Sequence, residues 1–182
     1  MNIPGMNKST ERARVFFALW PSPDLRRQLH ALALQYQKRH GGRAMRADTL
    51  HLTLLFLGEV QRGKSEELRQ HAEELAIASF SFCLQHIACW RHNQIAYAAP
   101  EEGLAPLLSL AEALRGVTDN AGIEFDRRGF TPHVTLLRKL AQPFDAQPVM
   151  LPEWRVDEFS LVESAPDMNG PRYRNLHTCR CR

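Results

Sequence analysis

The apolar residues of this chain recur with two periods, one typical of strands and one typical of helices. A short apolar run over 12–20 predicts a strand, and a Pro-Ser-Pro turn ends it. Residues 24–40 carry leucines at helical spacing, and a pair of glycines ends this helix. A second apolar run over 50–57, closed by Gly58, predicts a buried strand. The chain is therefore predicted to begin as strand, helix, strand.

The rest of the chain continues with the same two periods. Amphipathic helices are predicted over 63–80 and 104–121, and strands over 80–90, 94–99, from His133, over 155–164 and over 173–178. The segment from Arg138 to Pro152 is punctuated by prolines and is predicted as a loop. There is no Gly-x-Gly-x-x-Gly motif and no Walker lysine loop. We therefore expect an α+β fold with mostly antiparallel sheet.

One pattern occurs twice: a strand, a proline, a helix and then a strand that begins His-x-Thr-Leu. From Val15 to His51 is 36 positions, and from Ile95 to His133 is 38. Such spacing indicates a degenerate internal duplication. The expected architecture is bilobal, with two pseudo-symmetric lobes of mostly antiparallel sheet around a central cleft.

Length and composition favour one compact unit. The chain has 182 residues, of which 44% are hydrophobic, enough for one sizeable core shared by two small lobes. Residues 1–11 are polar, contain a proline and a glycine, and are predicted to be a flexible leader. Residues 12–182 are then a single two-lobed domain.

Charge and cysteine content limit the partners and the compartment. A net charge of +3 allows an anionic small substrate or a nucleic-acid end without requiring one. The apolar run over 15–20 is too short for a membrane span or a signal peptide, so we expect a cytoplasmic protein that uses no membrane. Reduced thiols are expected for Cys83, Cys89, Cys179 and Cys181. The terminal Cys-Arg-Cys-Arg offers only two thiolates, which is poor zinc coordination.

The two His-x-Thr-Leu copies are the main candidate site. On a strand, alternate side chains share a face, so His51 lies beside Thr53 and His133 beside Thr135. One copy alone would most simply be a strand histidine satisfied by a neighbouring carbonyl. Two copies arise by chance about once in a thousand sequences of this composition. The pair therefore indicates a site with two imidazoles and two hydroxyls.

Two imidazoles can act as acid and base in one reaction. The ordinary histidine pKa, about 6.5, allows one ring to be neutral while another is protonated. One ring would take a proton from an attacking hydroxyl or water, and the other would protonate the departing oxygen. The threonine hydroxyls would donate hydrogen bonds to phosphate oxygens. Phosphodiester cleavage is the reaction that most needs this set, and the two roles cannot be told apart from the spacing.

The same residues support three other kinds of site less well. A hydrolytic zinc centre needs a third protein ligand, and neither motif has a carboxylate two or four residues from its histidine. A serine or cysteine hydrolase needs a nucleophile elbow, and Gly-x-Ser-x-Gly is absent. A module that binds nucleotides without chemistry is the remaining alternative.

Basic and aromatic residues near the second motif fit either binding or catalysis. Arg127 and Arg128 could hold phosphate, but a solvated loop is the favoured interpretation for at least one of them. Phe130 is equally compatible with base stacking and with core packing. Arg138 is the stronger substrate-binding candidate, because we expect it on the same strand face as His133.

These motifs resemble those of a known superfamily. His51-Leu-Thr-Leu54 followed by Leu57-Gly58-Glu59, together with the segment from Arg128 to Arg138, resembles the paired motifs of two-histidine (2H) phosphoesterases. Within that superfamily the chain is most similar to bacterial RNA 2′,3′-cyclic phosphodiesterases, once called 2′-5′ RNA ligases. The similarity runs from the strand at Arg14 to about Tyr173. The Cys-Arg-Cys-Arg tail departs from the family pattern.

The resemblance implies a fold, a reaction and a role for each motif residue. It implies hydrolysis of a 2′,3′-cyclic phosphate end of RNA to a 2′-phosphate, without metal or other cofactor, and with reversible 2′-5′ ligation as a related activity. Carried over, His51 is the proton donor and His133 the proton acceptor. Thr53 and Thr135 bind phosphate, and Arg138 and Phe130 are further substrate-binding candidates. The expected partner is an RNA end or a cyclic nucleotide, and the expected state is a monomer.

Overall fold

The computed structural model describes residues 11–168 and 170–182. The predicted leader over residues 1–11 therefore lies outside the described part of the chain, except for Glu11. The described residues form an α+β fold, with α1 (Pro23–His40), α2 (Arg62–Glu73), α3 (Leu104–Asn120), the short 3₁₀ helix η1 (Ala47–Thr49), and the strands β1 (Arg12–Leu19), β2 (Arg43–Ala44), β3 (Leu52–Gln61), β4 (Phe80–Phe82), β5 (His86–Trp90), β6 (Ile95–Ala99), β7 (Val134–Arg138), β8 (Gln147–Pro148), β9 (Trp154–Val156), β10 (Glu158–Ala165) and β11 (Arg172–Arg180).

Most elements lie where the hydrophobic pattern places them, and several of the differences lie around β4 and β9. The helix expected over 63–80 ends at Glu73, and the strands expected over 80–90 and 155–164 are each split in two. The cause is a separate two-stranded sheet in which β4 pairs with β9. Residues 74–79 connect α2 to that sheet and are not helical, so tertiary pairing overrides the helical pattern.

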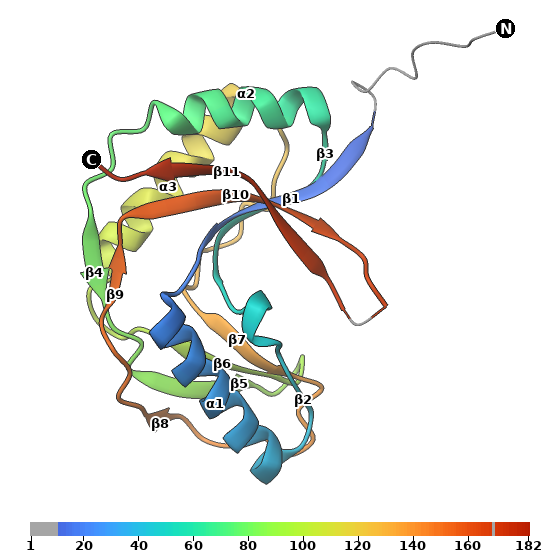
Figure 1. Ribbon diagram of the computed structural model, residues 1–182, viewed down its shortest axis with the longest axis vertical. Helices are drawn as coiled ribbons and strands as arrows, with labels where there is room; N and C mark the ends of the chain where they lie inside the picture. Colours follow the sequence, from blue (N-terminus) through green and yellow to red (C-terminus); the bar gives the residue numbers. More distant parts are fainter. Residues whose placement is uncertain (1–10, 169) are drawn as a thin grey trace, which may run out of the picture.

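The two motif strands lie side by side in the middle of the main sheet. Its strand order is β11-β10-β1-β3-β7-β6-β5-β8, with β2 on β7, and every pairing between described strands is antiparallel (Figure 1). β3 and β7 meet at the pair Leu52–Val134. β1 flanks β3 on one side, and β6 flanks β7 on the other. The strand that precedes each motif in the predicted repeat thus lies next to that motif strand, while the duplication itself stays a prediction.

The helices α1 and α3 each pack against a strand of the other predicted repeat. α1 follows β1 in the chain but packs against β7, and α3 follows β6 but packs against β3 (Figure 1). Leu29 of α1 and Leu107 of α3 are fully buried in one core cluster that includes both motif strands. Each helix therefore covers the motif strand of the other repeat. The two-lobed description itself stays a prediction, since both repeats share one sheet and one core. No described helix is both long and apolar enough to span a bilayer.

Both motif strands carry a bulge directly after the threonine. In β3, Thr53 pairs with Ala18 and Leu55 with Phe17, so Leu54 is an extra residue. In β7, Thr135 pairs with Tyr97 and Leu137 with Ala96, which leaves the residue between them without a partner. A bulge reverses the alternation of faces beyond it. Consecutive leucines in each motif can therefore all enter the core, as their burial shows.

The bulges decide which later residues face the site. Arg138 is expected from the sequence on the face of His133, but strict alternation gives the opposite face, because positions 133 and 138 are five apart. The extra residue in β7 returns Arg138 to the face of Thr135. The bulge in β3 does the same for Phe56, which occupies the equivalent position three residues after Thr53.

Gly58 does not end its strand, as the sequence had indicated. β3 continues to Gln61, and Gly58 lies at a second irregularity of the β1–β3 pairing with a φ of 70°. Glycine adopts this left-handed conformation without the steric cost that a Cβ brings. Glycine here permits a bulge and lets the strand continue.

The C-terminal cysteines belong to the fold. Cys179 is buried in β11, and burial raises the pKa of its thiol to about 11. Backbone hydrogen bonds from Cys181 and Arg182 to Asp157 and Ile77 hold the end of the chain. All four cysteines are free thiols. A neutral, buried Cys179 agrees with the expectation that this tail is a poor zinc ligand set.

Candidate active site

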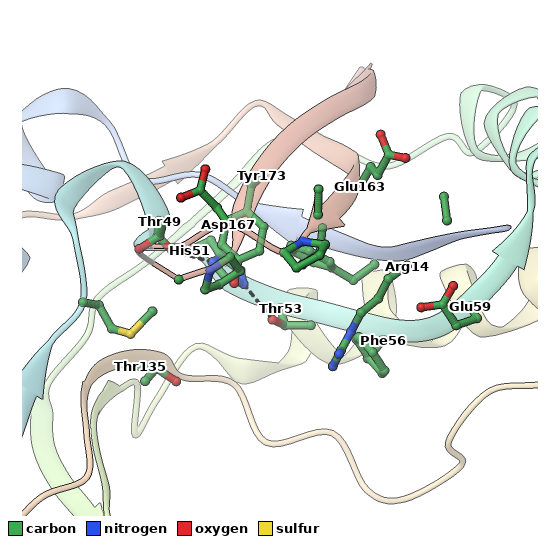
Figure 2. A pocket seen from close by; sticks show the side chains of 18 of the residues that line it. Arg14, Thr49, His51, Thr53, Phe56, Glu59, Thr135, Glu163, Asp167 and Tyr173 are labelled. Atoms are coloured by element: carbon green, nitrogen blue, oxygen red, sulfur yellow. Dashed lines mark hydrogen bonds between the residues drawn. The ribbon is translucent and has the colours of Figure 1, made fainter.

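The four motif side chains line one cavity of about 880 Å³ (Figure 2). The register that pairs Leu52 with Val134 places His51 across from Thr135 and Thr53 across from His133. Side chains on neighbouring strands at such positions lie about 5 Å apart at Cβ. The antiparallel centre of the sheet therefore sets two imidazoles and two hydroxyls around one small space.

His51 is held at both ring nitrogens. Its Nδ1 lies 2.7 Å from the carbonyl oxygen of Thr49, and its Nε2 lies 3.1 Å from Oγ1 of Thr53 (Figure 2). Thr49 closes η1 and is itself fixed by a hydrogen bond from its hydroxyl to the carbonyl of Arg46. Because a carbonyl only accepts, Nδ1 of His51 carries the proton of the neutral ring. Nε2 is then left to exchange protons in the cavity.

His133 repeats this arrangement. Its Nδ1 donates to the carbonyl oxygen of Thr131 at 2.7 Å, again two residues before the histidine. The same tautomer follows, with Nε2 as the exchangeable position. The two repeats differ in the threonine contact, since within the described residues a hydrogen bond to the motif threonine is seen for His51 only. Both imidazoles are thus oriented by local backbone and present the same nitrogen.

Aromatic rings surround each imidazole and lower its pKa. Phe16, Trp20 and Tyr173 lie with ring centroids 5.0–5.5 Å from that of His51. Burial among them is the main cause that lowers the pKa of His51 to about 4, and the charges of His133 and Arg138 act in the same direction. The bond to Thr49 opposes this shift. In the free protein at pH 7, His51 is therefore neutral.

His133 lies in a smaller aromatic group. Trp90 and Tyr97 lie with their centroids 4.6 and 5.8 Å from its ring, and both meet it edge to face. Burial lowers the pKa of His133, the Arg138 charge lowers it further, and the bond to Thr131 opposes both. The electrostatic influence of Arg138 on both rings shows that this cation is close to the centre of the site.

Arginines and carboxylates line the rest of the cavity. Arg138 contributes from β7, and Arg12 and Arg14 contribute from β1. Glu163 also lines it, but Arg62 and Arg174 form ion pairs with this carboxylate. Asp167 and Tyr173 come from the β10–β11 hairpin (Figure 2). The cavity therefore offers cationic groups to an anion and keeps one of its acids neutralised.

Of the residues proposed from sequence, five line the cavity and Phe130 does not. The five are His51, Thr53, His133, Thr135 and Arg138. Phe130 instead packs against the hydrophobic core, the alternative that the sequence had left open. Arg127 pairs with Asp119, and Arg128 pairs with Asp126, both on the protein surface. These two arginines match the solvated-loop interpretation.

The donor set does not form a metal site. Across residues 11–168 and 170–182, no group of three or more His, Cys, Asp or Glu side chains is arranged to hold an ion. The ring nitrogens Nδ1 of both motif histidines are already engaged by backbone carbonyls. The chemistry available here is proton transfer and hydrogen bonding to an anion.

Comparison with known proteins identifies the family. The family model described as the 2′-5′ RNA ligase superfamily matches residues 21–167. The chain belongs to the 2′-5′ RNA ligase superfamily. An RNA 2′,3′-cyclic phosphodiesterase of Escherichia coli is 30% identical over 168 residues, which are 92% of this chain and 96% of the relative. One of Thermus thermophilus is 32% identical over 176 residues, with 90% and 87% covered.

Solved structures agree with this superfamily membership. The crystal structure of E. coli LigT complexed with 3′-AMP superimposes with a TM-score of 0.87 at 29% identity, covering 94% of this chain and 99% of LigT. The structure of TT0787 of Thermus thermophilus gives a TM-score of 0.81 at 28% identity, with 93% and 98% covered. The α+β fold is therefore shared along almost the whole chain.

Several residues of the site in this superfamily member were not anticipated from sequence. Tyr173 belongs to the last strand, and Arg14 and Phe56 lie on β1 and β3. Arg12, Arg14 and Phe16 alternate along β1, so their shared face could have been predicted had the site been placed beside that strand. Nothing local marks Phe56 or Tyr173, because a bulge and a distant strand pairing bring them in.

Proposed function

We propose that this protein hydrolyses 2′,3′-cyclic phosphodiester ends of RNA to 2′-phosphates by acid–base catalysis without metal. The observation that carries the proposal is the central register, which sets His51, Thr53, His133 and Thr135 around one cavity. Four curated relatives carry the name RNA 2′,3′-cyclic phosphodiesterase, at 25–32% identity. The similar structure of E. coli LigT complexed with 3′-AMP supports a nucleotide ligand for this chain.

The proposed reaction has one step at phosphorus. His133 takes a proton from water through Nε2 as the water oxygen bonds to phosphorus. The bond from phosphorus to the 3′-oxygen breaks, and His51 delivers its Nε2 proton to that oxygen. Thr53, Thr135 and Arg138 hold the non-bridging oxygens as their charge grows. The product keeps the 2′-phosphate and gains a 3′-hydroxyl.

The low pKa of His51 sets a condition on its role as donor. In the free protein its pKa is about 4, so the ring must take up a proton when the substrate binds. An anionic phosphodiester beside Nε2 favours the charged ring and raises that pKa. Proton uptake is therefore coupled to binding, and phosphate-bearing ligands are expected to bind more tightly as the pH falls toward 5.

The assignment of donor and acceptor rests on the superfamily resemblance, because both rings present Nε2 in the same way. We no longer propose that Phe130 stacks a nucleobase of the substrate, since its side chain packs against the core. One chain supplies the whole quartet, so we propose that a monomer is active. Four free cysteines agree with the proposed cytoplasmic location.

The decisive experiment is incubation with an RNA oligonucleotide that ends in a 2′,3′-cyclic phosphate. The expected product carries only a 2′-phosphate, identified by its resistance to an enzyme specific for 3′-phosphates. Turnover should be equal with and without chelator. A domain that only binds RNA ends would retain the substrate uncleaved, and zinc-dependent or manganese-dependent turnover would contradict the acid–base proposal.

Ligation is a second candidate function, favoured by the superfamily description. If the 5′-hydroxyl of another RNA replaces water, the same step forms a 2′-5′ phosphodiester. By reversibility, the two histidines exchange roles when that bond is broken. Adding an excess of 5′-hydroxyl RNA should give a joined product that a 3′-5′-specific nuclease leaves uncut at the junction.

A further inference from the structure

The cavity extends from the motif quartet in one direction only. β7 and the residue before it contribute His133, Thr135 and Arg138, and all other lining residues belong to β1, β3, the segment before β3, or the β10–β11 hairpin. The cavity therefore continues along the β1 side of the sheet, beyond the space needed by one phosphate. A longer substrate would lie there.

A solvent-exposed aromatic ring lies in that extension. Phe56 is 40% exposed although it belongs to a central strand, and it is the one aromatic side chain among the exposed large hydrophobics of the described residues. The β3 bulge turns it to the face of Thr53. An exposed phenyl ring inside a polar cavity is typical of a binding surface.

The side chain of Arg14 lies against the exposed ring of Phe56. Its guanidinium lies over the ring of Phe56, 4.8 Å from the centroid, and reaches it from the neighbouring strand β1 (Figure 2). Arg12 points to the same side two residues earlier. Glu59 pairs with Arg14 in the β1–β3 register and also lines the cavity. A stacked guanidinium and phenyl ring beside further positive charge is the combination that binds single-stranded nucleic acid.

The spacing fits the nucleotide before the RNA end. Thr53 pairs with Ala18 and Phe56 with Phe16, so the ring lies two strand positions from the phosphate-binding threonine. Two strand positions span about 7 Å, roughly the length of one extended nucleotide. We propose that Phe56 and Arg14 form a subsite that stacks the base of the penultimate nucleotide when the cyclic phosphate occupies the quartet. This subsite rests on the proposed function and makes RNA chains better substrates than mononucleotides.

The test compares three substrates: adenosine 2′,3′-cyclic phosphate, the ApA dinucleotide with the same cyclic end, and that dinucleotide without its 5′ base. Wild type should show a kcat/KM for the dinucleotide about tenfold above that for the mononucleotide, the size expected for one base on an aromatic ring. Removing the 5′ base should abolish most of that advantage. Phe56→Ala should also abolish it, and Phe56→Tyr should keep it.

A matched control is Leu108→Ala, because Leu108 is 45% exposed on α3 and does not line the cavity. It should leave the ratio of the two kcat/KM values at the wild-type level. Equal use of the intact and the abasic dinucleotide by wild type would overturn the subsite. So would a Phe56→Ala protein that lowers both rates in proportion and retains the ratio.

A binding measurement separates this inference from the proposed function. Dissociation constants are measured for adenosine 2′-monophosphate and for ApA with a terminal 2′-phosphate. If wild type hydrolyses none of the substrates, the proposed function fails, while tighter dinucleotide binding that Phe56→Ala abolishes still supports the subsite. Equal dissociation constants for the two ligands would overturn the subsite by itself.

Discussion

The two motif segments share the His-x-Thr-Leu-Leu pattern and the same bulge, but they differ in character three residues after the threonine. Phe56 occupies this position in β3, and Arg138 occupies it in β7. The β3 strand therefore contributes an aromatic ring to the cavity at this position, and the β7 strand contributes a cation. The two motifs thus place matching histidines and threonines at the centre of the cavity, and the difference at one equivalent position makes its two sides unlike.

The two motif histidines also differ in their surroundings. Three aromatic rings surround His51, which also contacts Thr53, whereas His133 lies against two rings. Burial is the main cause that lowers both pKa values. The backbone carbonyl two residues earlier orients each ring identically. Similar local geometry with unequal surroundings allows one reaction to use two histidines differently.

Replacing either histidine should give the largest loss. His51→Ala and His133→Ala should each lower kcat by about 10²–10⁴-fold on the natural substrate, because each removes a proton-transfer group. An activated aryl phosphodiester, whose phenolate leaves without protonation, should partly rescue His51→Ala but not His133→Ala. Steady-state rates on both substrates decide this. Rescue of His133→Ala alone would show that the roles are reversed.

Replacing the motif threonines should give the next largest loss of activity. These variants also test the hydrogen bond between His51 and Thr53, which distinguishes the first motif from the second. Thr53→Val and Thr135→Val keep the β-favouring shape and remove a hydroxyl aimed at phosphate, so each should lower kcat by about 10²-fold. Thr53→Val should lose more, because Thr53 also contacts Nε2 of His51. Wild-type rates in both variants would make these threonines purely structural.

The pH dependence should follow from the protonation state that the proposal requires. His51 must be protonated and His133 neutral, yet the pKa of His51 is about 4 and that of His133 is below its ordinary value in the free protein. Above both pKa values, the protonated fraction of His51 falls about tenfold per pH unit. A kcat/KM profile should therefore decline by about that factor from pH 7 to 8. A flat profile in this range would place the proton donor elsewhere.

The smallest expected effect concerns two positions with positive φ. Gly58 has a φ of 70° and Lys139 a φ of 56°, one after each motif. Gly58→Ala should cost about 1 kcal/mol of stability, since a Cβ is disfavoured at positive φ, while Lys139→Gly should gain up to about that amount. Urea unfolding measures both. A Cβ at position 58 would meet only the Phe56 ring at 3.8 Å, so steric overlap does not confuse the result.

The sequence was sufficient for most of the elements and for the residues of the quartet. Two buried strands that begin His-x-Thr-Leu, each preceded by a strand and a helix, predict an antiparallel α+β fold and a shared site. These inferences succeed because periodicity and motif spacing are local properties of the chain. They fail at residues 74–79, where pairing of β4 with β9 is worth more than local helical preference.

Only the tertiary structure decided which other residues join the site. A one-residue bulge reverses every face beyond it, and its position depends on hydrogen bonding to a strand elsewhere in the chain. Arg138 and Phe56 reach the cavity for this reason, and Phe130, though nearer His133 in sequence, remains in the core. The aromatic side chains around His51 likewise come from β1, the residue directly after it, and β11, which are separated by most of the chain. The motif residues can be recognised in two short segments of sequence. The residues that surround them in the cavity depend on long-range strand pairing, which no short segment specifies.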